Sequence, residues 1–342
     1  MRNLRFLAAA ATTLVLAAGT AGCTSRNDTA AEGEATSDGP TRIAFVPKLQ
    51  GSPYFEAMDA GAQRAAEELG DIEWLYQGPT TADAAQQADV VRSFIQQQVD
   101  VLVVAPNDPD SMAPVLQEAQ AAGIHVATSD TDAPNSVREV FVNQATADGI
   151  AKQVIDSLAA AMGESGEFAI VSCGETAENL NSWIAAEKEY VAAEYPDMTL
   201  TEVGFSGEDQ AANAQMATDY MNANPNLEGL IGQCTTSAVG VAQAVRDAGR
   251  IGEVFTVGVG TPQSMKPYLE DGSSSASILW DVENFGYLTA WAGRQLALGE
   301  EFQETNEVSE ELGEVEYVPE EEMLILGPAL EITPDNVDDF DY

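Results

Sequence analysis

The sequence predicts an α/β fold with two doubly wound parallel sheets, one after the other along the chain, joined by a hinge. From residue 42 onward, short apolar runs alternate with segments whose apolar residues recur at helical spacing, and this series occurs twice. Strands that are short and continuously apolar are typical of parallel sheets covered on both faces. About 300 residues take part, a length that usually forms two cores.

The first series predicts one lobe. Gly70 follows the first apolar-periodic segment and is expected to end its helix, because glycine readily adopts the left-handed conformation found at helix C-termini. The expected strands are residues 42–47, 72–76, 101–105, 124–128 and 139–142, and the expected helices are 54–69, 84–97 and 110–122.

The second series predicts the other lobe and the hinge. Its expected strands are 168–173, 200–205, 230–234, 254–258 and 277–280, and its helices are 181–194, 211–222 and 237–248. A helix at 287–298, an acidic irregular stretch at 300–316, a last strand at 323–326 and a tail at 338–342 should follow. We expect crossings between lobes near 143–146, near 281–284 and within 317–322. The N-terminal lobe would then comprise 42–143 and about 284–318, and the C-terminal lobe 144–283 and about 319–342.

The first 22 residues have the pattern of a secretory signal peptide. Arg2 and Arg5 precede an apolar stretch at 6–16, and small residues at 18–22 lead to Cys23. A cysteine at this point resembles the lipobox of bacterial lipoproteins, which implies cleavage before Cys23 and lipidation of its sulfur. An ordinary signal peptide is the alternative. Residues 23–41 are polar and predict a flexible tether, so we expect a folded body anchored by lipidated Cys23 to the outer face of the cell membrane.

Charge and length exclude other classes of partner. The chain has 14 Lys and Arg against 56 Asp and Glu, a net charge of −42 that repels phosphate backbones, so we expect no nucleic acid partner. No later apolar run reaches the roughly 20 residues of a membrane helix. Membrane contact should therefore be through the lipid anchor alone.

Catalytic patterns are missing from the sequence. His125 is the single histidine and lies in an apolar run, which favours a hydrogen-bonded core residue. There is no P-loop, no G-x-S-x-G motif and no G-x-G-x-x-G motif. Asp130 and Asp132 are two residues apart on one loop, and such residues rarely flank a glycosidic bond from opposite faces. We expect no enzyme activity, no catalytic residue, no metal and no cofactor.

Polar and aromatic residues instead follow the ends of the expected strands. In open parallel sheets, ligands bind outside the carboxyl ends of the strands. Carboxylates, amides and aromatic faces suit a small polyhydroxylated ligand, although each residue alone could be a helix cap, a turn residue or part of the core. The candidate ligand-binding residues are Lys48, Tyr54, Phe55, Asn107, Asp130, Asn179, Asn181, Cys234, Thr236, Trp280 and Asp281.

Cys173 and Cys234 end the first and third strands of the second series. These strands are neighbours in doubly wound topology, which would bring the cysteines within reach of a disulfide. An exported location permits oxidation. A disulfide or a close thiol pair is expected at the mouth of the cleft, and two buried apolar residues remain the alternative.

Several segments together resemble a known family. RIAFVPKLQGSPYFEAMDAGAQRAAEELG, YQGPTTADAAQQ, APNDPD, TSDTD, NQAT, VGVGTPQSMKPYLEDG and LWDV occur in order across 42–342. They closely resemble the periplasmic binding proteins of ABC importers, and most of all the branch that includes rhamnose-binding and autoinducer-2-binding proteins. The resemblance implies a clamshell, expected as a monomer, that closes on a sugar-like ligand and delivers it to an ABC permease.

The same resemblance places ligand contacts at Lys48, Asp130, Cys234 and Thr236. The autoinducer-binding pattern has an Asp-Gln pair where this chain has Asn179 and Leu180, and Asn179 resembles the rhamnose-type arrangement. Leu180 departs from both patterns. The ribose and galactose branches usually have Arg where Thr131 stands. We therefore expect a rhamnose-like sugar or another small polyhydroxylated ligand, with an autoinducer-2 receptor as the alternative. A sugar-responsive repressor would need a basic DNA-binding segment in place of the signal peptide.

Overall fold

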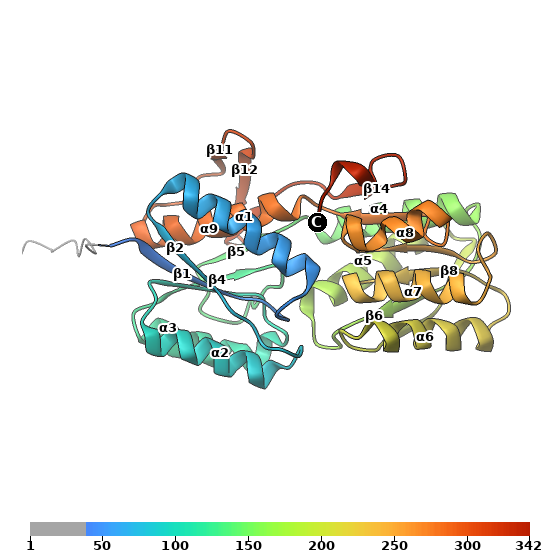
Figure 1. Ribbon diagram of the computed structural model, residues 1–342, viewed down its shortest axis with the longest axis horizontal. Coiled ribbons are helices and arrows are strands. Elements are labelled where there is room, and N and C mark those ends of the chain that lie inside the picture. The colour runs from blue at the N-terminus through green and yellow to red at the C-terminus, as the bar shows by residue number, and fades with distance from the viewer. Residues whose placement is uncertain (1–38) are drawn as a thin grey trace, which may run out of the picture. The chain divides into compact units, whose positions relative to one another are not determined.

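The computed structural model describes residues 39–342, so the expected signal peptide and Cys23 lie outside the described residues. Two α/β lobes are seen, each with helices on both faces of its sheet (Figure 1). The first sheet has the strand order β11-β12-β13-β5-β4-β3-β1-β2, and the second has the order β14-β10-β9-β8-β6-β7. Among the described helices, none has the length and apolar character needed to cross a bilayer.

The first lobe is built on the parallel strands β1 to β5. Ile43 and Phe45 face the core under α1 and α9, whereas Ala44 and Val46 face the core under α2 and α3, because alternate side chains of a strand point to opposite faces. Its elements are β1 (Thr41–Val46), α1 (Pro53–Leu69), β2 (Ile72–Tyr76), α2 (Ala84–Gln97), β3 (Val101–Val104), α3 (Pro109–Ala121), β4 (His125–Ser129) and β5 (Val140–Asn143).

The second lobe repeats this architecture. Phe168 and Ile170 of its central strand belong to the larger core with α4 and α5, and Ala169 and Val171 belong to the core with α6 and α7. Its elements are α4 (Ala147–Met162), β6 (Gly166–Ser172), α5 (Glu178–Glu194), β7 (Met198–Phe205), α6 (Gln210–Ala223), β8 (Leu227–Gly232), α7 (Thr235–Asp247), β9 (Phe255–Gly258), α8 (Pro262–Asp271) and β10 (Ala276–Leu279).

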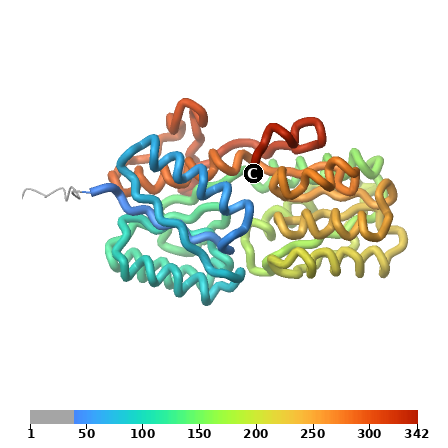
Figure 2. The backbone as a smooth tube through the Cα atoms, viewed as in Figure 1, coloured from blue at the N-terminus to red at the C-terminus, as the bar shows by residue number. Residues whose placement is uncertain are grey.

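The C-terminal segment crosses between the lobes twice more (Figure 2). Helix α9 (Val282–Leu298) returns to the first lobe, where β11 (Thr305–Ser309), β12 (Gly313–Val318) and β13 (Met323–Ile325) extend the sheet beyond β5. Strand β14 (Leu330–Ile332) then pairs antiparallel with β10 in the second lobe, before a short 3₁₀ turn at Val337–Asp339. The backbone N–H of Val282 donates to the Tyr342 hydroxyl at 3.3 Å, which holds the chain end against the second crossing.

The expected fold class is confirmed, with most strand and helix positions correct to within a few residues. Gly70 ends α1 in the left-handed conformation with φ of 75°, as expected. Helices α4 and α8 and strand β14 were not among the expected elements. Because β14 follows β13, the strand within residues 323–326 is not the last one in the chain.

Two further expectations about the C-terminal segment were wrong. The acidic stretch 300–316 is not irregular, because β11 and β12 form an antiparallel hairpin whose inner face carries Asn306, Val308 and Val315 while its glutamates point outward. The third crossing lies after Ile325 instead of within 317–322, because β13 pairs in parallel with β5 and so still belongs to the first sheet. Glutamate is unfavourable in strands, and pairing of β12 with β13 outweighs that preference.

Candidate ligand-binding site

A small cavity lies between the two lobes, at the carboxyl ends of their parallel strands. Its volume is about 50 Å³, so the lobes are close together around it. Both lobes contribute to the wall, which mixes charged, amide and aromatic side chains. The lining residues are Lys48, Ser52, Tyr54, Phe55, Asp130, Asn179, Leu180, Trp183, Glu208, Gln233, Cys234, Thr235, Val259 and Trp280.

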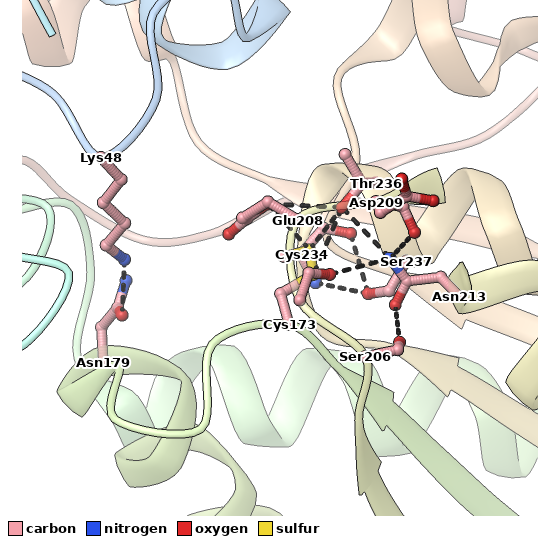
Figure 3. Close-up of a disulfide and its surroundings, with 11 residues drawn as sticks. Lys48, Cys173, Asn179, Ser206, Glu208, Asp209, Asn213, Cys234, Thr236 and Ser237 are labelled. Carbon is pink, nitrogen blue, oxygen red and sulfur yellow. Dashed lines mark hydrogen bonds between the residues drawn. A yellow bond between two sulfur atoms is a disulfide. The ribbon is translucent and has the colours of Figure 1, made fainter. Parts of the chain in front are cut away.

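A buried polar trio links the lobes at one side of this cavity. Lys48, just after β1, donates from Nζ to Asn179 Oδ1 of α5 at 3.0 Å (Figure 3). The same Nζ lies 3.1 Å from Asp130 Oδ2. Asn179 Nδ2 in turn donates to Asp130 Oδ2 at 3.4 Å. All three residues are at most 6% exposed. Because buried charges are costly unless paired, these contacts hold Lys48 and Asp130 in place and give a ligand both donors and acceptors.

Asp130 has an unusual backbone conformation. Its φ is +67°, in the left-handed region that side-chain-bearing residues other than Asn and Asp rarely adopt. Asp and Asn tolerate this region better than other side-chain-bearing residues, so the turn favours one of these two residues at position 130. The turn directs the Asp130 carboxylate from the end of β4 toward Lys48 instead of leaving it to cap a following helix.

Aromatic rings form a second wall. Trp280, at the end of β10, packs edge-on against Tyr54 and against Trp183, with ring centroids 5.8 Å apart in both pairs. Its Nε1 donates to the Tyr54 hydroxyl at 3.1 Å across the lobes. Burial, followed by the nearby charge of Asp130, raises the pKa of Tyr54 well above its usual value, so the hydroxyl keeps its proton. The rings can cover the C–H face of a ligand while the phenol hydroxyl remains polar.

On the other side, a disulfide joins Cys173 and Cys234, whose Cα atoms are 6.2 Å apart. Strands β6 and β8 pair directly with Val171 opposite Gly232, so the two cysteines that follow them are brought together. The disulfide is one of the two arrangements expected for these residues. Glu208 lies beside it, with Oε2 3.6 Å from Cys234 Sγ (Figure 3). Burial is the main cause that raises the pKa of Glu208, and the Lys48 charge opposes it.

Gln233 connects the cavity wall to a carboxyl behind it. Its Nε2 donates to Glu187 Oε1 of α5 at 2.7 Å. Glu187 is 1% exposed, and its Oε2 and the Oε1 of Gln233 have no hydrogen-bond partner among the described residues. Burial raises the pKa of Glu187 to about 8, so this carboxyl is mostly protonated at neutral pH.

The structure brings seven of the eleven candidate residues to the cavity, and whether they bind a ligand stays a prediction. These seven are Lys48, Tyr54, Phe55, Asp130, Asn179, Cys234 and Trp280.

The other four candidates have structural contacts instead. Asn107 Nδ2 donates to the Lys48 carbonyl at 2.9 Å and so supports the loop behind the cavity. The exposed Asn181 donates to the Glu175 carbonyl at 2.9 Å, and Asp281 caps α9 by accepting from the Asn284 N–H at 2.9 Å. Thr236 lies one residue beyond the lining and bonds to the disulfide sulfurs and Glu208. Strand-end position alone does not separate caps and loop supports from ligand contacts.

Seven lining residues were not among the candidates: Ser52, Leu180, Trp183, Glu208, Gln233, Thr235 and Val259. Glu208 and Gln233 follow β7 and β8, and the same strand-end rule would have found them. Leu180 and Trp183 lie on α5, and their direction depends on how that helix packs. No local signal gives that packing.

One further expectation, about a titratable residue, was wrong. His125 is not a core residue: its side chain is 41% exposed at the start of β4, and Nδ1 lies 3.1 Å from Glu139 Oε2. Asp132 does not line the cavity with Asp130. Its two oxygens accept from Arg138 Nε and Nη2, each at 2.8 Å, which makes it a structural ion-pair partner.

Comparisons with known proteins agree with this architecture. Residues 43–301 match the family model described as periplasmic binding protein domain. A D-ribose/D-allose-binding protein of Pseudomonas aeruginosa is 31% identical over 265 residues, which are 75% of this chain and 81% of the relative. A D-apiose import binding protein of Actinobacillus succinogenes is 25% identical over 245 residues, 70% of this chain and 77% of the relative.

Solved structures have the same fold. An ABC transporter solute binding protein of Clostridium phytofermentas with bound L-rhamnose is 27% identical, with a TM-score of 0.82 over 88% of this chain and 98% of that one. LsrB of Clostridium saccharobutylicum in complex with AI-2 has a TM-score of 0.83 at 24% identity, over 88% of this chain and 100% of that one, and shows the fold alone.

Two α/β lobes that meet around a small cavity define a clamshell binding protein. The chain belongs to the periplasmic binding protein family, as the sequence predicted. The named relatives are binding proteins and not enzymes, in agreement with the expectation that this chain is not an enzyme. The family is one of extracytoplasmic proteins.

Proposed function

We propose that this protein captures a small neutral sugar outside the cytoplasm and delivers it to an ABC permease. One observation carries the proposal: Lys48 and Asp130 from one lobe meet Asn179 from the other, beside the Trp183 and Trp280 rings. A ligand at this point would contact both lobes at once.

The composition of the wall favours a hydroxylated ligand with a partly apolar body. Lys48 is the single basic side chain among the described residues that line the cavity, and it is already paired with Asp130. An anionic ligand would meet the carboxyls of Asp130 and Glu208 without a spare positive charge. Sugar hydroxyls, in contrast, can bond to carboxylates and amides, and a buried polar group left without a partner costs about 1–3 kcal/mol.

A deoxy sugar such as L-rhamnose is the first candidate ligand. Leu180, Phe55 and Val259 add an apolar surface suited to a methyl group beside the tryptophan rings. The relative solved with L-rhamnose is 27% identical to this chain. The ribose- and allose-binding relative supports the broader class of small sugars, so these sugars belong in the same test.

Closure of the lobes would couple binding to delivery. Besides the Lys48–Asn179 contact, Thr176 Oγ1 donates to the Asn107 carbonyl at 3.1 Å across the lobes. A ligand shifts such an equilibrium only through contacts that it makes in the closed form and not in the open one. The permease would then recognise the closed pair of lobes.

Calorimetric titration tests the proposal. The panel comprises L-rhamnose, D-ribose, D-allose, D-apiose and AI-2, the last being the alternative that the sequence leaves open. We expect sugar to bind with a stoichiometry of one molecule per chain, and L-rhamnose to bind most tightly of the panel. Asp130→Asn keeps the left-handed turn, which Asn tolerates, and should weaken binding at least about 100-fold through loss of charge-assisted hydrogen bonds.

The matched control is Asp83→Asn. Asp83 caps α2 away from the cavity, and Asn is an equally good cap, so this variant should bind like the unmodified protein. Equal affinity of the Asp130→Asn variant and the control would remove Asp130 from the site. Tight binding of AI-2 and of no sugar would replace the proposed ligand.

We further propose that the chain is a monomeric lipoprotein held at the membrane by Cys23. The basic and apolar leader followed by small residues and this cysteine supports the proposal. Mass spectrometry of the N-terminal peptide should find a diacylglyceryl group on Cys23, and Cys23→Ser should release the protein from the membrane fraction. An unmodified Cys23 in the mature protein would overturn the lipoprotein assignment.

A further inference from the structure

The disulfide and its neighbours form a compact set of potential metal ligands. Cys173 Sγ, Cys234 Sγ and a Glu208 carboxylate oxygen all lie within 4.8 Å of one another. The two cysteines are at most 8% exposed, and Glu208 is half-buried. Thr236 Oγ1 lies 3.3 Å from Cys173 Sγ, 3.2 Å from Cys234 Sγ and 3.3 Å from Glu208 Oε2, so all three groups surround one hydroxyl (Figure 3).

We propose that Cys173, Cys234 and Glu208 form a redox-gated site for a thiophilic divalent cation such as Zn²⁺. In the oxidised protein, both sulfurs are committed to the disulfide and the site is closed. Reduction by a dithiol adds two electrons and two protons to the disulfide and gives two thiols, while the dithiol becomes a disulfide. Binding of the cation then displaces the thiol protons and leaves two thiolates and one carboxylate as ligands.

The geometry suits a zinc-like ion. Zinc takes thiolate ligands at about 2.3 Å and carboxylate oxygens at about 2.0–2.2 Å, in tetrahedral arrangement. In the oxidised protein the two sulfurs are bonded to each other, so their separation is that of the disulfide. The Cα atoms of the cysteines lie 6.2 Å apart and Glu208 Oε2 lies 3.6 Å from Cys234 Sγ, which keeps the three side chains within reach of one ion once the disulfide is reduced. Three protein ligands leave a fourth position open, and two of the three, Cys234 and Glu208, line the cavity.

The types of ligand in this cluster favour a soft cation. Cys234 is the N-cap of α7, and the N-terminus of a helix stabilises a thiolate. Two thiolates favour zinc and related soft cations over calcium or magnesium.

Cobalt provides the test, because tetrahedral Co²⁺ with thiolate ligands absorbs visible and near-ultraviolet light. The purified protein is reduced with dithiothreitol, freed of reductant without oxygen, and titrated with Co²⁺. We expect one Co²⁺ per chain in the reduced protein, its displacement by Zn²⁺, and no such absorption in the oxidised protein. No sugar enters this experiment, so its result is independent of the proposed function.

Variants assign the ligands. Cys173→Ser and Cys234→Ser should each abolish the thiolate-to-cobalt band or reduce it by half or more. Glu208→Gln, which leaves the thiols unchanged, should weaken Co²⁺ binding at least about tenfold. Glu310→Gln is the matched control, since Glu310 is exposed on the β11–β12 hairpin, and it should change nothing.

Three results would overturn the proposal. The first is equal binding of Co²⁺ by the oxidised protein and by reduced protein in which a thiol assay finds both thiols free. The second is a Glu208→Gln variant that binds Co²⁺ as tightly as the Glu310→Gln control. The third is a disulfide that resists reduction until the protein unfolds, because the site would then never open in the folded state.

Discussion

Glu187 is a buried carboxyl with a single hydrogen bond, from Gln233. Burial moves its pKa from 4.5 in the unfolded chain to about 8 in the folded protein. Between these two values the folded protein binds one more proton than the unfolded chain. Its contribution to stability is therefore fully present below pH 4.5 and is lost as the pH rises toward about 8.

Glu187→Gln should remove this pH dependence. The amide keeps the shape of the side chain and carries no charge at any of these pH values. We expect the variant and the original protein to differ little at pH 4, and the variant to be more stable by on the order of 3 kcal/mol at pH 7. Urea unfolding at pH 4 to pH 8 measures the difference.

The control is Glu189→Gln on the exposed side of the same helix, which should give no such trend. A difference between the Glu187→Gln variant and the original protein that stays constant over this pH range would show that Glu187 is ionised when buried. Because Gln233 lines the cavity, the same experiment tests whether the support behind the cavity wall is neutral.

At the scale of elements, helices α1 and α9 approach so closely that two glycines are required. A Cβ at Gly61 would lie 1.8 Å from the Glu283 carbonyl oxygen, and a Cβ at Gly286 would lie 1.9 Å from the Met58 carbonyl oxygen. These are backbone atoms, which cannot turn aside as a side chain can. The contact holds the returning helix α9 on the first lobe, although the two helices are far apart in sequence.

Gly286→Ala should therefore destabilise the protein by at least about 2 kcal/mol, even though alanine favours a helix by about 1 kcal/mol over glycine. Gly293→Ala in the same helix is the matched control. Its new Cβ would lie 3.1 Å from the Ile43 side chain, which can adjust, so its cost should be much smaller. Thermal unfolding of both variants measures the difference, and equal melting temperatures would contradict the close backbone contact.

At the scale of the whole molecule, the lobes are closed on a cavity too small for a sugar. The cavity volume is about 50 Å³, and the Lys48–Asn179 and Tyr54–Trp280 hydrogen bonds join the lobes across it. A sugar would need to separate these side chains to enter. The three chain crossings between the lobes allow such a motion as a hinge.

We expect small-angle X-ray scattering of the ligand-free protein to give a radius of gyration larger than that calculated from the described residues. Saturating sugar should reduce the measured value toward the calculated one, because it adds contacts between closed lobes. The Asp130→Asn variant at the same sugar concentration should keep the larger radius of gyration of the ligand-free protein. A radius of gyration that sugar does not change would argue against coupling between closure and binding.

Several features of this protein follow from the sequence alone. Buried parallel strands need continuous apolar runs, and the helices between them need apolar residues at helical spacing, so both leave a local pattern. This is why β2 and α2 were predicted with the bounds that the structure has. The position of Lys48, Asp130 and Cys234 after strands also predicted their presence at the cavity, because parallel strands place their carboxyl ends at one edge.

Only the tertiary structure decided the rest. The hairpin at β11 and β12 forms against β13, although its glutamates disfavour a strand, and the third crossing depends on β13 pairing with β5. The packing of α5 determines that Trp183 faces the cavity and that Glu187 lies buried behind Gln233. Periodicity along a chain reports which side chains are buried, but partners distant in sequence determine which groups those side chains meet.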